Sequence, residues 1–200
     1  MSTTTAPKFR APIKKSETTL ILWGRLSYPS LFEAKAVNGS ADKKFSVSLI
    51  ISKDDAVTIA TIKEAQLHLE NEARDKFKIK KGTPMPTSFK FPLRDGDIDR
   101  SSDESYENSF FLGANCKTKP QVINSKKEVI TDPDELYPGC YGYISVNFYV
   151  FDASGNKGIA CGLNNVMKVV EGERLAGRPS ANEDFADVAV EDGEEAEDFM

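Results

Sequence analysis

Apolar and polar residues alternate over much of the chain, a pattern that predicts β-strands with one buried face. The strands that we expect cover residues 18–27, 44–52, 87–93, 109–116, 120–124 with a partner near Val129, 140–152 and 159–163. A turn at residues 153–158 joins the last two strands as a hairpin. Residues 164–175 fit a short strand or a helical turn.

One stretch has helical spacing instead, from residue 54 to about residue 80. Its expected buried positions are Ile62, Leu69, Ala73 and Phe77. Ser52, with Asp55 three residues later, is close to a capping box, and Gly82 with two following prolines ends the helix. We therefore predict a mainly β protein: an antiparallel β-barrel with one substantial helix at about 54–80 and extra hairpins. The OB-fold is a barrel of this kind.

Charge is distributed unevenly between the body of the chain and its end. Nine of the 31 acidic residues lie between Glu183 and Met200, where no basic residue occurs. The preceding 182 residues hold the other 22 acidic residues and all 26 basic ones, so that the net charge of −5 conceals a body of +4. We predict a flexible basic arm at 1–16, a folded domain at 17–177 and a disordered acidic tail at 178–200.

The sequence carries no signal for export or for membrane insertion. The N-terminal segment has basic residues but no apolar core, and the longest apolar runs, such as residues 20–23, are far too short to cross a bilayer. The three cysteines, Cys116, Cys140 and Cys161, are odd in number and form no C-x-x-C pair. We therefore expect reduced thiols, a cytoplasmic location and no membrane partner.

The long strand at 140–152 has an unusual polar face. Its core side consists of Ile144, Val146, Phe148 and Val150, and the opposite side consists of Tyr141, Tyr143, Ser145, Asn147 and Tyr149. Tyrosine combines a flat apolar ring with a hydroxyl that tolerates water, which suits stacking on a nucleobase. An equally good interpretation is that this face packs under the helix or against a second subunit.

Basic side chains are interleaved with aromatic ones on other strands and loops. In strand 18–27, Trp23 and Arg25 lie opposite the leucines; a lone Trp is more often core than ligand platform, whereas Arg25 is hard to bury without a partner. In 87–93 we expect Phe89, Phe91 and Leu93 in the core. Cations that follow phosphates and rings that stack on bases are what single-strand binding requires. The candidate DNA-binding residues are Trp23, Arg25, Lys43, Lys44, Lys90, Arg94, Lys117, Lys119, Tyr141, Tyr143 and Tyr149.

Signals for an enzyme are weak, and we predict neither catalysis nor a cofactor. His68 is the only histidine, and no Gly-Lys dipeptide exists for a phosphate-binding P-loop. Residues 95–106 superficially suggest a calcium loop, but Arg100 stands where a glycine is needed and Tyr106 where a bidentate glutamate belongs. We expect a polar surface loop there. A two-metal site remains an unsupported alternative for Asp95, Asp97, Asp99, Asp103 and Glu104.

Three segments, at residues 24–35, 135–152 and 156–175, together resemble a phage protein family. The most specific pieces are Ser27-Tyr28-Pro29 with Leu31-Phe32, Leu136-Tyr137 followed by Gly139, and Lys157-Gly158-Ile159 followed by Leu163. The family is a former domain of unknown function, DUF2815, whose members are thought to be OB-fold single-stranded DNA-binding proteins similar to the T7-type phage protein. The resemblance covers residues 17–177. Tyr28 and Phe32 lie in a family motif, although Pro29 between them indicates a structural turn.

The resemblance implies sequence-independent binding of single-stranded DNA during phage DNA replication and recombination, in the cytoplasm of the infected bacterial host. It also implies that the acidic tail competes with DNA and, through Asp198 and Phe199, recruits the phage DNA polymerase or other replication proteins. Met200 after Phe199 departs from the family pattern of a terminal aromatic residue. Duplex binding stays open. Two other classes compete: an assembly protein that self-associates through its aromatic β-face, and a nuclease accessory that uses the acidic cluster.

Overall fold

The computed structural model describes residues 7–36, 42–153 and 155–175, so the predicted tail at 178–200 lies outside the described residues. The strands are β1 (Ile13–Lys14), β2 (Thr19–Ala36), β3 (Lys43–Ser52), β4 (Leu93–Asp95), β5 (Ser109–Cys116), β6 (Gln121–Ile123), β7 (Tyr141–Ala153) and β8 (Asn156–Val170). The helices are α1 (Ala56–Phe77) and the one-turn α2 (Gly96–Asp99), with 3-10 turns η1 (Glu104–Tyr106) and η2 (Pro133–Glu135).

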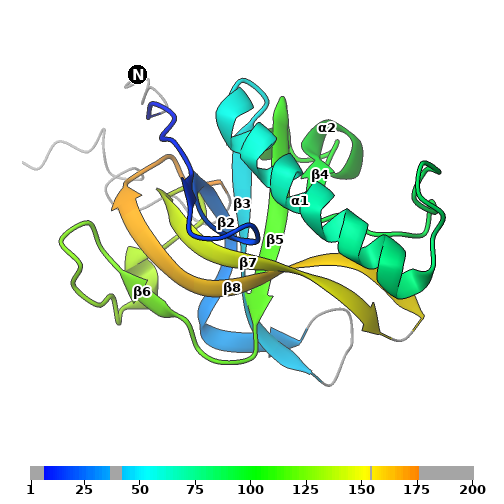
Figure 1. Ribbon diagram of the computed structural model, residues 1–200. Helices are drawn as coiled ribbons and strands as arrows, with labels where there is room; N and C mark the ends of the chain where they lie inside the picture. Colours follow the sequence, from blue (N-terminus) through cyan, green and yellow to red (C-terminus); the bar gives the residue numbers. More distant parts are fainter. Residues whose placement is uncertain (1–6, 37–41, 154, 176–200) are drawn as a thin grey trace, which may run out of the picture.

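Five strands form a closed barrel. The pairs β2–β3, β3–β5, β2–β7 and β7–β8 are antiparallel, and a parallel contact between Asn115 of β5 and Gly162 of β8 closes the ring. The long β2 serves two neighbours: it pairs with β7 through residues 19–25 and with β3 through residues 25–36. This is the predicted OB-type barrel, to which β1, β4 and β6 are added as short flanking strands (Figure 1).

The inner faces of the barrel strands and one face of α1 build a single core. Predicted core positions such as Leu22, Leu49 and Ile144 are completely buried, which confirms the alternation along these strands. α1 packs over the barrel and adds Ile59, Ile62, Ala65, Leu69 and Ala73 to the same cluster (Figure 1). Phe77 at the end of the helix packs against this cluster but is only partly buried.

The predicted helix is confirmed, but its cap is not the one expected. Asp55 is the N-cap, and its carboxylate accepts a hydrogen bond of 3.1 Å from the backbone N–H of Thr58. The hydroxyl of Ser52 instead accepts from the N–H of Asp54, because Ser52 is still the last residue of β3. The helix ends at Lys78, whose φ of 55° is left-handed and breaks the helical repeat.

Three other predictions change. Residues 87–93 are not a strand: only Lys90 bridges to Gly158 before β4 begins, and Phe91 is exposed rather than in the core. Residues 164–170 are part of β8, so this segment is a strand and not a helical turn. The segment predicted as a polar loop contains α2 and η1, because the side chains of Asp95 and Asp103 cap these two short turns.

The remaining structural predictions concern membrane spans and cysteines. Among the described residues, no helix combines the length and apolarity needed to cross a membrane. Cys140 and Cys161 are buried, Cys116 is partly buried, and all three are free thiols, as expected. Burial raises the pKa of the Cys116 and Cys140 thiols, which keeps them protonated at neutral pH.

Candidate nucleic-acid interface

The outer surface of β3 and β5 is hollowed into a groove of about 400 Å³, the β3–β5 groove. Its floor consists of small side chains that alternate with the core residues of both strands. Ser46 lies opposite Asn115, and Ser48 lies opposite Gly113. The floor is therefore flat and weakly polar, and nothing on it projects far into the groove.

Aromatic rings and guanidinium groups form the wall at one end of this groove. The guanidinium carbon of Arg94 lies 5.0 Å from the centre of the Phe111 ring, and that of Arg100 lies 5.5 Å from the Tyr28 ring. Phe91 also lines the groove and is exposed. Such contacts hold cations beside ring faces. Arg94 is also paired with the carboxylate of Asp99 at 2.9 Å.

Tyr28 owes its position to a local irregularity in β2. The register between β2 and β3 shifts between Ser27 and Ser30, and Tyr28 itself has a φ of 45°, which is costly for a residue with a side chain. Its ring is 53% exposed, and its hydroxyl donates a hydrogen bond of 3.2 Å to Asp103. Desolvation and the Asp103 carboxylate raise the pKa of Tyr28, so the ring stays neutral.

Buried and charged contacts hold the segment from β4 to η1 against the barrel. Tyr106 is completely buried, packs edge-on against Phe111 at 5.0 Å and donates a hydrogen bond to the Ser48 hydroxyl at 3.4 Å. Lys53 binds Asp95 at 2.8 Å and Asp97 at 2.6 Å. A hydrogen bond from Lys53 lowers the pKa of Asp97 and favours its ionised form.

The acidic cluster considered as a metal site is thus engaged in structural contacts. Asp95 and Asp97 bind Lys53, Asp99 binds Arg94 at 2.9 Å, and Asp103 caps η1 and accepts from Tyr28. Within the described part of the chain, no three His, Cys, Asp or Glu side chains are arranged to hold a metal ion. The carboxylates position the wall of the groove.

Lysines gather at the other end of β3 and β5. Lys43 and Lys44 begin β3, and Lys117 directly follows β5, next to the paired residues of the two strand ends. Lys35 of β2 stands opposite Lys44 in the ladder. Like charges directly opposite each other are unfavourable, so an anion bound here would relieve their repulsion.

Four of the predicted DNA-binding residues lie elsewhere, on the outer surface of β2 and β7, here called the tyrosine face: Trp23, Arg25, Tyr141 and Tyr143. Trp23 is only 2% exposed, because the guanidinium of Arg10 lies 4.3 Å above its ring and Tyr143 packs beside it at 5.0 Å. Arg25 donates a hydrogen bond of 2.7 Å to the backbone carbonyl of Glu173. A base could reach Trp23 only after Arg10 had moved.

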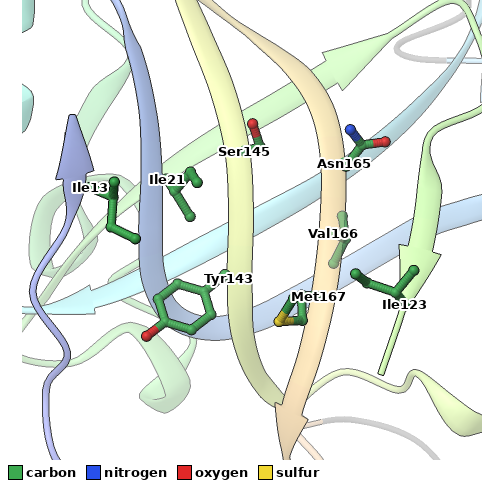
Figure 2. A pocket seen from close by; sticks show the side chains of 8 residues that line it. All are labelled: Ile13, Ile21, Ile123, Tyr143, Ser145, Asn165, Val166 and Met167. Carbon is green, nitrogen blue, oxygen red and sulfur yellow. The ribbon is translucent and has the colours of Figure 1, made fainter. Parts of the chain in front are cut away.

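The tyrosine face continues into a shallow apolar trough of about 300 Å³. Figure 2 shows its lining side chains on β1, β2, β7, β8 and β6, which run side by side. They are Ile13, Ile21, Ile123, Tyr143, Ser145, Asn165, Val166 and Met167. Arg10 lies near the Tyr143 ring, whereas the trough itself has no charged lining residue.

A family model described as "Enterobacter phage Enc34, ssDNA-binding protein" matches residues 19–200. The chain belongs to this family. Protein p50 of Acyrthosiphon pisum secondary endosymbiont phage 1 is 31% identical to it over 175 residues, which cover 86% of this chain and 94% of p50. The resemblance to phage single-stranded DNA-binding proteins noted in the sequence is confirmed.

Two solved structures share the fold. The single-stranded DNA-binding protein of bacteriophage Enc34, in complex with ssDNA, superimposes with a TM-score of 0.66 at 23% identity, over 86% of this chain and all of that one. The gp2.5 protein, a single-stranded DNA-binding protein of bacteriophage T7, gives a TM-score of 0.56 at 17% identity, over 88% of this chain and 98% of that one.

The other residues predicted from the sequence lie in different places relative to the β3–β5 groove. Lys90 is exposed and adjoins Phe91, and Tyr149 pairs with Ala160, which lines the groove. Lys119 instead lines a separate hollow with Phe32. The set predicted from the sequence is therefore divided among the surroundings of the β3–β5 groove, the tyrosine face and the hollow that Lys119 lines.

Sequence reasoning left out several residues of the groove: Tyr28, Phe91, Arg100, Phe111 and Gly113. Tyr28 stood in a motif but was interpreted as part of a turn, and Phe91 was placed in the core. Gly113 in the middle of a strand was an available signal, because such a glycine often marks a close approach by a ligand or another backbone. No sequence pattern pointed to Arg100 as a binding residue, because it lies within a long polar segment.

Proposed function

We propose that this protein binds single-stranded DNA without sequence preference, in the β3–β5 groove, during phage DNA replication and recombination. One observation carries the proposal: exposed rings and cations border a concave floor of small polar side chains. OB barrels bind oligonucleotides on the face of their second and third strands. In this barrel those strands are β3 and β5.

The groove residues divide into two roles. Arg94 and Arg100 at one end, and Lys43, Lys44 and Lys117 at the other, contact phosphates. Tyr28 and Phe91 stack on bases, with Tyr149 and Lys90 beside them. Stacking accepts any base, because every base has a π-face, and this makes the binding independent of sequence.

The tyrosine face, which holds four of the residues predicted from the sequence, offers an alternative path for the DNA strand. It has rings at Trp23, Tyr141 and Tyr143, with Arg25 beside them. Its rings are partly covered, and its arginine is bonded to backbone carbonyls. The β3–β5 groove is the better candidate because its rings and cations have room for a ligand.

We further propose that the acidic tail at 178–200 competes with DNA for the cations of the groove. A tethered polyanion has a high local concentration and imitates a phosphate backbone. DNA that displaces the tail would free Asp198 and Phe199 to recruit the phage DNA polymerase or other replication proteins. We expect this competition and recruitment to take place in the cytoplasm of the infected bacterial host.

A titration of fluorescently labelled oligo(dT) tests the main proposal. It is run at about 50 and 200 mM salt, with magnesium present, and the DNA is examined afterwards on a gel. We expect intact DNA and an affinity that falls with salt while a salt-insensitive part from stacking remains. A duplex of equal length, titrated in parallel, decides whether double-stranded DNA is also bound. Absence of salt-dependent binding would refute the proposal, and shortened DNA would indicate a nuclease.

A second candidate function is self-association through the apolar trough. Ile13 at its edge is exposed, and five strands contribute to one apolar surface. An assembly protein would then form stable oligomers without DNA. Sedimentation of the full chain over a range of concentrations separates this function from DNA binding by a monomer.

A further inference from the structure

The glycines in the described strands have two kinds of surroundings. A Cβ atom at Gly24 would lie 2.5 Å from the carbonyl oxygen of Ile50, and one at Gly142 would lie 2.2 Å from that of Met167. At Gly158 the obstacle is the carbonyl oxygen of Lys90 at 2.3 Å, and at Gly162 it is the side-chain oxygen of Asn147 at 2.7 Å. At Gly24, Gly142 and Gly158 a backbone carbonyl therefore excludes a side chain, whereas at Gly162 the Asn147 side chain would have to move to admit one.

Gly113 in β5 is different. A Cβ atom built there would have no neighbour within 4 Å, and its φ lies outside the left-handed region that favours glycine. The residue is exposed in mid-strand, where glycine weakens a β-strand compared with almost any other residue. Neither packing nor backbone conformation in this protein explains a glycine at this position.

The surroundings of Gly113 indicate what the missing side chain leaves room for. Gly113 forms the groove floor with Ser48, its partner on β3, while Phe111 and the two arginines stand toward one end of β5 and Lys117 toward the other. The cations that would hold phosphates are thus toward the ends of the floor. The middle is a flat area of backbone and small side chains, with the aromatic rings toward the arginine end.

We propose that Gly113 is the seat of a nucleobase, whose flat ring lies directly on the β5 backbone beside Ser48. This inference rests on the proposed binding of single-stranded DNA in the groove and assigns a contact position within it. A side chain at residue 113 would keep the base from the strand. Glycine at residue 113 then permits contact with the base, although it makes strand β5 less stable than another residue would.

Two substitutions test this assignment, Gly113→Ala and Gly113→Val. Both side chains enter open space, so the melting temperature should stay equal to that of the unsubstituted protein or rise. Affinity for oligo(dT) should fall roughly threefold for alanine and tenfold or more for valine, within the range of a weakened base stack. The slope of log affinity against log salt should not change, because no charge is altered.

Ser145→Val is the matched control. It adds one heavy atom in mid-strand, as Gly113→Ala does, on the trough side of the barrel, where we expect no effect on oligo(dT) binding. If valine at 113 lowers the melting temperature, the alanine variant decides, since it adds one methyl group. Normal oligo(dT) affinity in the alanine and valine variants would overturn the assignment while leaving the proposed function intact. If the unsubstituted protein fails to bind oligo(dT), the proposed function itself is wrong.

Discussion

The β3–β5 groove and the tyrosine face contain the same kinds of side chain in different states. In the groove, the ring of Tyr28 is 53% exposed; on the tyrosine face, Trp23 is 2% exposed under the guanidinium of Arg10. Arg100 lies against rings at the groove wall, whereas Arg25 donates to the backbone carbonyl of Glu173. An aromatic and cationic strand face is therefore open to a ligand only where the rest of the chain has not already covered it.

The cause of the difference is what each flanking segment does. The segment before β2 folds back, with β1 pairing to Leu20 and Ile21, and brings Arg10 onto the tyrosine face. The segment from β4 to η1 instead stands beside β5 and builds a wall, held by Tyr106 and Lys53. The segment before β2 covers the tyrosine face, whereas the segment from β4 to η1 forms a wall that makes the β3–β5 groove deeper.

Charge reversal of the lysines at the ends of β3 and β5, next to the groove, should have the largest effect. In the triple variant Lys43→Glu, Lys44→Glu, Lys117→Glu, we expect oligo(dT) affinity at low salt to fall by about a hundredfold or more, with a salt slope smaller by about 2. The matched control is Lys15→Glu, Lys126→Glu, Lys127→Glu, which changes the net charge equally at positions away from β3 and β5. Equal losses in both variants, measured by fluorescence anisotropy, would show that net charge rather than the groove governs binding.

Removing one aromatic ring distinguishes the β3–β5 groove from the tyrosine face as the site of DNA binding. Tyr28→Ala should cost about 1–3 kcal/mol of oligo(dT) binding, whereas Tyr28→Phe keeps the stack and should bind normally. If only the groove holds DNA, the double variant Tyr141→Ala, Tyr143→Ala binds like the unsubstituted protein. A loss of about 1–3 kcal/mol per ring in that double variant, with folding intact by circular dichroism, would place the strand on the tyrosine face.

Deleting the acidic tail should have a smaller effect in the opposite direction. Removal of Glu183–Met200 changes the net charge from −5 to +4 and removes the competitor proposed for the groove. We expect tighter oligo(dT) binding at low salt and a proportionally larger gain for duplex DNA, since polyanion competition is screened as salt rises.

Phe199→Ala separates the two roles of the tail, because it leaves every charge in place. It should leave DNA affinity unchanged but abolish capture of the phage DNA polymerase, measured by surface plasmon resonance. Unchanged low-salt affinity after the deletion would mean that the tail does not occupy the groove.

The smallest expected effect concerns the anchor of the groove wall. A hydrogen bond from Lys53 lowers the pKa of Asp97 below its ordinary 3.8, so the ionised carboxylate favours the folded state above that value. This contribution disappears as the pH falls through the lower pKa of the folded protein. Asp97→Asn should therefore melt slightly below the unsubstituted protein at neutral pH, and the gap should close as the pH falls below 3.8 and through the lower pKa of the folded protein. A gap that persists in acid would show that another contact of Asp97 stabilises the wall.

Much of the fold could be predicted because it depends on local periodicity. The alternation in Lys43–Ser52 and Tyr141–Ala153 specifies which face is buried, and the helical repeat of Ile62, Leu69 and Ala73 specifies one side of α1. The errors occurred where non-local contacts decide the outcome. Phe91 follows a pattern typical of a core strand, yet its segment makes a single bridge to β8 and leaves the ring exposed.

The sequence by itself determined that this is a β-barrel with one helix, that its body is basic and its end acidic, and that the outward faces of its strands carry aromatic and cationic side chains. These properties follow from composition and from side-chain direction, which alternates residue by residue. Only the tertiary structure decided which outward face is open. Arg10 covers Trp23, Tyr28 turns outward at a bulge, and Arg100 reaches the groove from a separate segment. Exposure depends on contacts between segments distant in the chain, and no local pattern encodes them.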